Sequence, residues 1–366
     1  MEFYQGPLLA PGEVIGRGGT FVGFASGAAG MHFNPASVAA RTIYNCHDFS
    51  EIDFSIDRYV LGLLGDKRLD IDNDGRANGP QDNTVFALVG FDLVHGRSGF
   101  GARASAQNYT VCTQEPCRGK NVARYNLTVA GLAAGQNFYD DQIIVGVELD
   151  VPVALVGRSS ERKRFLMGVG GIVGAVWRPN DADYRLGASL RSPMRLWRLP
   201  GGPKDRPGFI YPRTVEVPWE LAWGGAISFG PRPFNPAVPP GHEQTGADFG
   251  FDRRYLLLAL DLFVTGRTHQ TTTVESWLHQ DFRPSGQNLT AGFRLGAESE
   301  VWADVLKLRA GTYLEPARAA GVDDRWHGTG GFELHLGKWW IDWSFNATVD
   351  LARDYDNILV TFGSWH

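Results

Sequence analysis

Residues 16–39 read GRGGTFVGFASGAAGMHFNPASVA, a stretch of small and apolar side chains with six glycines. Each glycine in a helix interior costs about 1 kcal/mol relative to alanine, and a free surface loop would be more polar. Small side chains allow a segment to pack closely within an enclosure, and Asn34-Pro35 ends a helix or sets a turn. We therefore predict that the rest of the chain encloses this stretch.

The composition of the 366-residue chain narrows the possible classes of protein. Its net charge of -5 argues against a general nucleic-acid-binding surface. No run of about 18 apolar residues is present, so we predict no transmembrane helix. A β-barrel with a polar lumen has this kind of composition. The sequence has no Gly-x-Ser-x-Gly, nucleotide-loop or zinc motif, and we predict no enzymatic activity.

Alternation with a period of two indicates β-strands from residue 83 onward. Ile143, Val145 and Val147 fall on one face of their segment, and Glu148 and Asp150 fall on the other. Full charges on the second face are typical of a wall with lipid outside and water inside. About fourteen segments have strand character, including residues 85–94, 100–111, 121–133, 143–155, 165–177, 184–190, 215–229, 255–265, 274–279, 287–299, 305–313, 328–336, 339–352 and 357–365.

Five ordered stretches carry a resemblance to a known family. They are the glycine-rich segment ending in Asn34-Pro35-Ala36, YRLGASLRSP at 184–193, VPW at 217–219 with GGA at 224–226, residues 255–265, and FRLGAE at 293–298 followed by LRAGTY at 308–313 and Pro316. Their order and spacing resemble those of the outer-membrane long-chain fatty-acid transporters, the FadL/OmpP1/TodX group. The chain departs from the family pattern at Ser26-Gly27, where an acidic pair is usual, and at its end, where Trp365 is only penultimate.

The resemblance implies an all-β fold: a transmembrane antiparallel β-barrel of about 14 strands in the bacterial outer membrane. Residues 1–50 would form an N-terminal plug in the lumen, and residues 51–366 the barrel. The implied function is passive uptake of hydrophobic small molecules such as fatty acids. Some relatives instead serve secretion or surface motility, so the alternative is a non-transporting barrel that binds an envelope protein partner. Residues 1–5 lack a signal-peptide pattern, so this localisation requires either that the numbering starts at the mature chain or that the start codon is assigned too far downstream.

Candidate ligand contacts come from the predicted plug, because its larger side chains would meet an apolar ligand. These are Phe21, Phe24, Met31, Phe33, Asn34 and Pro35.

Charges within the predicted strands should face the lumen, because a charge on the lipid face costs up to about 2–4 kcal/mol. They could form a cross-strand charge ladder or a polar rim around a ligand path. The residues are Glu148, Asp261, Glu298, Glu300 and Arg309.

Asp70, Asp72, Asp74 and Gly75 follow the spacing of a calcium-binding loop. The twelfth position holds Gln81 where such loops place a bidentate glutamate, so a solvated acidic loop remains the alternative. Calcium is the one cofactor that the sequence suggests.

Cys112 and Cys117 flank a short turn-like segment that contains Pro116. The spacing predicts a local disulfide, which would fit an oxidising compartment, and two free thiols are the alternative.

Overall fold

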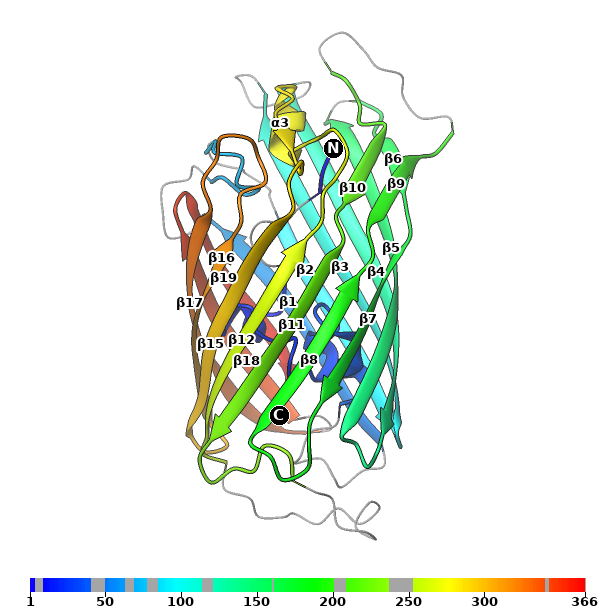
Figure 1. The fold of residues 1–366 in the computed structure, drawn as a ribbon. Coiled ribbons are helices and arrows are strands. Elements are labelled where there is room, and N and C mark those ends of the chain that lie inside the picture. The colour runs from blue at the N-terminus through cyan, green and yellow to red at the C-terminus, as the bar shows by residue number, and fades with distance from the viewer. Residues whose placement is uncertain are drawn as a thin grey trace.

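The computed structural model describes residues 1–3, 9–40, 50–62, 69–77, 85–113, 121–159, 161–200, 209–236, 253–339 and 342–365. Figure 1 shows a tall barrel with short helices inside it and at one mouth. The helices are α1 (Gly12–Gly16), α2 (Gly27–Gly30), the 3-10 helix η1 (Pro35–Ala39) and α3 (Val274–His279). None of the helices in the described part of the chain has the length and apolar character needed to span a membrane.

Seventeen strands form the main sheet of the described chain. In its first half these are β1 (Ser50–Leu61), β2 (Val85–His95), β3 (Ser98–Cys112), β4 (Val122–Phe138), β5 (Ile143–Arg158), β6 (Arg164–Met167), β7 (Gly170–Trp177), β8 (Tyr184–Arg191) and β9 (Met194–Arg198). The others are β10 (Thr214–Val217), β11 (Glu220–Phe229), β12 (Leu256–Thr265), β15 (Thr290–Trp302), β16 (Leu306–Glu315), β17 (Arg325–Lys338), β18 (Asp342–Ala352) and β19 (Tyr355–Ser364). A separate two-stranded sheet joins β13 (Thr271–Thr272) to β14 (Pro284–Ser285).

The main sheet closes on itself, because β1 pairs antiparallel with both β2 and β19. Three wall strands are interrupted, and each appears as two elements: β6 with β7, β8 with β9, and β10 with β11. Counting each interrupted pair once gives a closed barrel of 14 antiparallel wall strands in the described chain. The prediction of an antiparallel barrel of about 14 strands is confirmed.

Side chains along the wall alternate between exterior and interior. In β12, Leu256, Leu258 and Leu260 are exposed, whereas Leu257 and Ala259 between them are buried. The strand β5 repeats this pattern, as its alternation predicted. Because one face carries leucine and valine and the other carries charges, the wall has the character of a transmembrane barrel.

The two ends of the barrel differ in their connections. At the lower end in Figure 1, most connections are short turns, such as those between β2 and β3 and between β15 and β16. Longer segments join strands at the upper end, including the one that carries α3. We call these the turn end and the α3 end.

Exposed aromatic side chains surround the turn end, as in an interfacial girdle: Phe138, Tyr139, Trp177, Tyr184, Phe229, Trp302 and Trp339.

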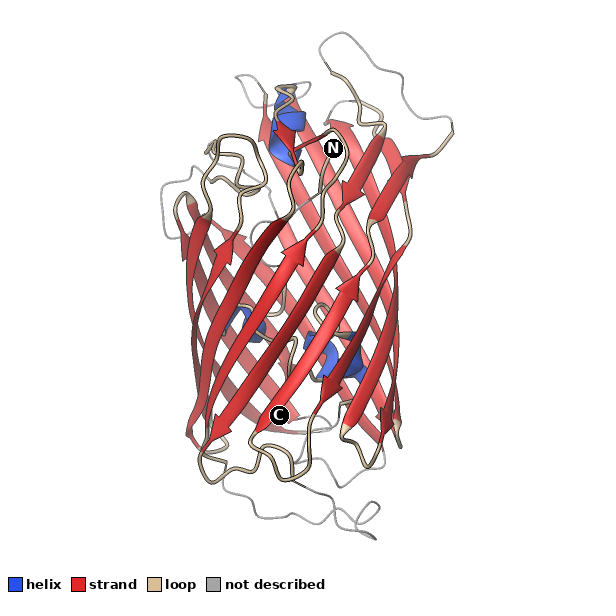
Figure 2. Ribbon diagram, viewed as in Figure 1, coloured by secondary structure: helices blue, strands red, loops and turns tan. Residues whose placement is uncertain are grey.

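Residues 9–40 run through the barrel interior and form the plug. Figure 2 shows the short helices of this segment enclosed by the strands. The first plug helix, α1, packs against β16 to β18, and η1 packs against β3 to β5 and β7. The enclosure predicted for the glycine-rich stretch is therefore present.

Residues 274–279 were expected to form a strand and instead form the helix α3. The Thr273 side chain accepts a hydrogen bond from the Ser276 backbone N–H and so caps the first turn. Short apolar segments fit either period, and here the cap and the contacts of the helix decide the outcome.

Candidate functional site

Asn34 fixes the plug to the wall. Its side-chain amide donates to the backbone oxygen of Val22 at 3.0 Å, within the plug, and to that of Ala175 on β7 at 2.9 Å. Its Oδ1 accepts from the backbone N–H of Ala36, so Asn34 caps η1, which begins at Pro35. The side chain is completely buried, so each of these bonds satisfies a group that water does not reach.

Asp261, on β12 of the wall, performs a similar role. Its Oδ2 accepts the backbone N–H groups of Phe21 at 2.8 Å and of Val22 at 3.0 Å. A wall carboxylate thus binds the plug backbone directly. Hydrogen bonds to charged groups are among the stronger ones in a folded protein.

The inner wall carries glycines where the plug approaches most closely. A Cβ atom at any of eight wall glycines would collide with plug atoms; these are Gly99, Gly101, Gly135, Gly146, Gly174, Gly187, Gly296 and Gly311. Side chains that fill the lumen elsewhere are therefore missing along the path of the plug. The inner surface of the wall and the surface of the plug are therefore complementary in shape.

One cavity beside the plug lies on its α3 side and measures about 140 Å³. Leu127, Val129 and Phe263 give it apolar walls, and Phe33 of the plug forms part of its floor. Arg191, Met194 and Pro218 also line it, and these residues stand where the wall strands β8/β9 and β10/β11 are interrupted. We call this space the α3-side cavity.

Charged groups border the α3-side cavity. The Arg103 guanidinium bonds Glu148 at 2.5 Å and Asp150 at 2.8 Å, and its Nη1 lies 3.3 Å from Nδ1 of His32. On the other side, the Arg294 guanidinium lies over the Phe263 ring at 4.4 Å. The cavity therefore combines apolar surface with a few fixed polar groups, which is the usual make-up of a small-molecule site.

The second cavity lies on the turn side of the plug and measures about 110 Å³. Phe21 and Phe24 of the plug line it, together with Tyr255, Lys307 and Arg309 of the wall and others. We call it the turn-side cavity.

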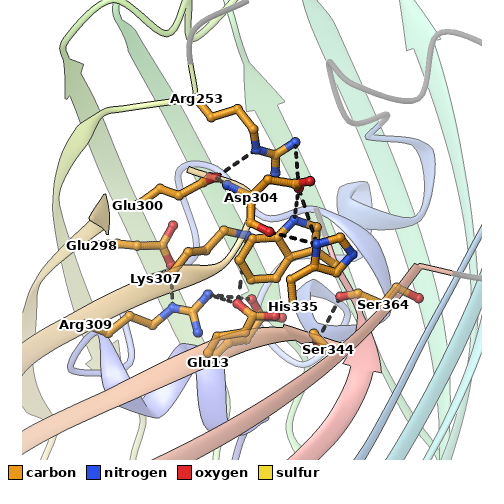
Figure 3. Close-up of polar contacts among 12 residues, drawn as sticks. Glu13, Arg253, Glu298, Glu300, Asp304, Lys307, Arg309, His335, Ser344 and Ser364 are labelled. Atoms are coloured by element: carbon orange, nitrogen blue, oxygen red, sulfur yellow. Dashed lines mark hydrogen bonds and ion pairs between the residues drawn. The ribbon is translucent and has the colours of Figure 1, made fainter. Parts of the chain in front are cut away.

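An ion-pair network borders the turn-side cavity and connects plug to wall (Figure 3). Arg17 of the plug pairs with Glu298 at 2.6 Å, and Arg309 pairs with the same carboxylate at 2.5 Å. Arg309 also pairs with Glu333 at 2.5 Å and approaches Glu13 of the plug at 3.8 Å. These groups are mostly buried, so their attraction is little screened by water or salt.

The network continues toward the turn end. Glu300 accepts a hydrogen bond from Arg253 at 2.7 Å, and the Lys307 ammonium lies 3.8 Å from the centre of the Trp365 ring. Trp365 is buried and stacks on His335, in contrast to the exposed aromatic girdle of this end.

The structure distributes the predicted ligand contacts between three places. Phe33 lines the α3-side cavity, whereas Phe21 and Phe24 line the turn-side cavity. Met31, Asn34 and Pro35 are buried between plug and wall, beside Gly101, Gly174 and Gly146.

The predicted lumen charges Glu148, Asp261, Glu298, Glu300 and Arg309 are all buried. Glu148 belongs to the α3-side group, Asp261 holds the plug backbone, and the other three lie in the turn-side network.

Several cavity residues were not among the predicted site residues. Arg103, Arg191 and Arg294 come from separate strands, and only the closed wall brings them around one space. His32, two residues before Asn34 in the plug, lies next to Arg103.

The acidic loop lies at the α3 end, where a fourth carboxylate joins it. Oxygen atoms of Asp70, Asp72, Asp74 and Glu275 all lie within 4.8 Å of one another, and all four residues are buried. Burial raises the pKa of Asp70 to about 6, although Arg325 opposes the shift. Burial and the neighbouring Asp74 and Asp70 carboxylates raise the pKa of Asp72 well above its usual range.

Cys112 ends β3 and is disulfide-bonded. Cys117 lies outside the described residues, so the predicted pairing of Cys112 with Cys117 stays a prediction.

Solved structures share this architecture. The monoaromatic hydrocarbon channel CymD aligns with a TM-score of 0.62 at 15% identity, over 98% of both chains. A FadL homologue from Pseudomonas aeruginosa gives 0.60 at 13% identity over 98% of both chains. The toluene transporter TodX from P. putida gives 0.60 at 13% identity, over 96% of this chain and 97% of its own. No family model matches the chain, and no curated protein matches it either.

At such identities the likeness shows a common fold. The resemblance noted in the sequence is thus confirmed at the level of the fold.

Proposed function

We propose that this protein is a bacterial outer-membrane channel for passive uptake of small hydrophobic molecules. The observation that carries the proposal is the α3-side cavity, because it lies between the plug and the part of the wall where strands are interrupted. Continuous strands seal a barrel through their hydrogen bonds, and an interruption removes some of these bonds. A ligand held in this cavity would have a short path toward the lipid.

The size and lining of the cavity favour a compact ligand. An engineered apolar cavity of about 150 Å³ binds benzene, so 140 Å³ suits a single aromatic ring better than an extended acyl chain. The names of the similar structures, a monoaromatic hydrocarbon channel and a toluene transporter, support this class of ligand. We therefore propose monoaromatic hydrocarbons as the preferred substrates, with fatty acids as weaker ones.

An uptake assay with matched variants tests the proposal. Gram-negative cells that express the protein, and cells that lack it, are given radiolabelled toluene or oleate. Val129→Trp fills the α3-side cavity from β4, and Leu132→Trp adds the same ring to the exposed outer face of that strand. We expect the protein to speed toluene uptake, Val129→Trp to abolish the gain, and Leu132→Trp to preserve it.

Heat-modifiable migration in detergent gels checks that both variants form the barrel. Uptake that is identical with and without the wild-type protein would refute the channel proposal. It would favour the alternative of a structural barrel that binds an envelope partner.

A further inference from the structure

We propose that Asp70, Asp72, Asp74 and Glu275 form a calcium site that joins two segments over the α3 end of the barrel. The site is independent of the proposed transport function.

The geometry brings together ligands from distant parts of the chain. Three carboxylates come from the loop after β1, and the fourth comes from α3, between β12 and β15. Ca²⁺ takes six to eight oxygen ligands, most often carboxylates and carbonyls. In a contiguous calcium loop the twelfth residue supplies a glutamate; this chain has Gln81 there, and Glu275 supplies a carboxylate from α3 instead.

A second observation concerns Asp72, which is only 7% exposed. Its Oδ2 accepts the backbone N–H of Glu275 at 2.8 Å. Its Oδ1 is also buried and has no hydrogen-bond partner among the described residues. An ionised oxygen without a partner in such a place is costly, and a bound cation would satisfy it.

The charge balance points in the same direction. Four carboxylates meet within 4.8 Å, whereas Arg325, the cation that acts on Asp70 and Asp72, is paired with Glu315 at 2.7 Å. Neighbouring donors satisfy part of the cluster: Asp74 accepts from the Ser276 and Thr273 hydroxyls, and Asp70 accepts from the backbone N–H groups of Asp74 and Gly75. The Oδ1 of Asp72 stays without a donor among the described residues, and a divalent cation held between the carboxylates would satisfy it.

The site would hold a cover on the barrel mouth. The loop of Asp70 is tied to the wall through the Asp354 carbonyl, to which the Asp70 N–H donates at 2.8 Å. The helix α3 departs from β12 and β15 but contacts β3 and β4, on the far side of the ring of strands. A cation between loop and helix would fasten two segments that meet across the mouth.

Calcium titration of the full chain in detergent tests the site directly. After removal of metals with a chelator, isothermal calorimetry should show one Ca²⁺ bound per chain, with a dissociation constant of about 1 mM or tighter. Magnesium at the same concentrations should bind more weakly, because it demands a smaller octahedral site. Absence of a binding signal up to about 10 mM Ca²⁺ would overturn the proposal.

Two variants and a matched control locate the site. Glu275→Gln and Asp72→Asn should each weaken calcium binding at least tenfold. Asp281→Asn should leave it unchanged, because Asp281 follows α3 closely yet pairs with Arg76 outside the cluster.

Limited proteolysis supplies a second readout. Calcium should protect the wild-type α3 segment and should not protect Glu275→Gln. Binding by Glu275→Gln equal to that of the wild type would refute the assignment. If Glu275→Gln does not form a heat-modifiable barrel, Asp72→Asn and the wild-type titration decide the question.

Discussion

The two cavities beside the plug have similar volumes and different borders. On the α3 side, leucine, valine and phenylalanine make much of the border, the ion pairs of Arg103 with Glu148 and Asp150 lie within the wall, and the neighbouring wall strands are interrupted. On the turn side, Arg17 of the plug and Glu298 and Arg309 of the wall make a buried ion-pair network, and the adjoining strands β15 and β16 are continuous.

The difference indicates where the barrel is easiest to open. Apolar contacts are non-directional and tolerate a small shift of their partners, whereas a buried ion pair loses much of its energy when one partner leaves. We infer that the plug is held most firmly on its turn side. The α3 side is then free to exchange a ligand while the barrier to ions stays in place.

The largest effect should come from neutralising the centre of the network. Glu298→Gln leaves Arg17 and Arg309 without their shared carboxylate, and loss of one partner of a buried pair costs about 3–5 kcal/mol. We expect a lower unfolding temperature and a higher ion conductance in planar bilayers.

The control for this variant is Asp140→Asn, which removes an exposed ion pair with Arg97. It should change the free energy of unfolding by less than about 0.5 kcal/mol. If Glu298→Gln behaves like this control, the network does not hold the plug and the comparison between the cavities fails.

A smaller effect should follow from crowding the seam between plug and wall. A side chain at Gly146 would strike the backbone of Pro35 and Ala36, so Gly146→Val should displace η1 at a cost of about 1–3 kcal/mol. Protease digestion of the folded barrel should then cut the plug faster. Gly328→Val is the matched control, because a Cβ at that wall glycine meets open space. Equal digestion of the two variants would show that the seam is loose.

The smallest effect is expected at Asn34. Asn34→Ala leaves the carbonyls of Val22 and Ala175 without this donor and should lower the free energy of unfolding by about 1–2 kcal/mol. Conductance should stay low, since the turn-side network is intact. Ser26→Ala, at the border of the turn-side cavity, should change stability by less than about 0.5 kcal/mol in thermal unfolding. High conductance of Asn34→Ala would place the main barrier at η1 instead.

Local sequence patterns predicted much of the fold. The alternation in residues 143–155 separates exterior Val145 and Val147 from interior Glu148, because a strand turns successive side chains to opposite faces. The glycines of residues 16–39 predicted a closely enclosed segment. Pro193 and Pro218 lie at two of the strand interruptions, where proline cannot donate the ladder hydrogen bond.

The sites were less predictable, because they depend on which strands and loops meet. Glu275 and Asp72 are 203 residues apart and share one hydrogen bond, and no local pattern relates them. Arg103 and Arg294 approach the same cavity from strands on different parts of the ring. For α3, Thr273 followed by Glu275 was a readable sign of a helix start, although the segment is too short for periodicity to settle.

The seam between β1 and β19 has a consequence for biogenesis. It joins the first strand of the wall to the last, so the cylinder cannot be completed until the C-terminal strand has been made. The plug precedes every wall strand in the chain, yet its contacts include both β1 and β19. The plug must therefore dock during or after the final closure of the barrel. A chain truncated before β19 would lose the closure of the wall and part of the surface that contacts the plug.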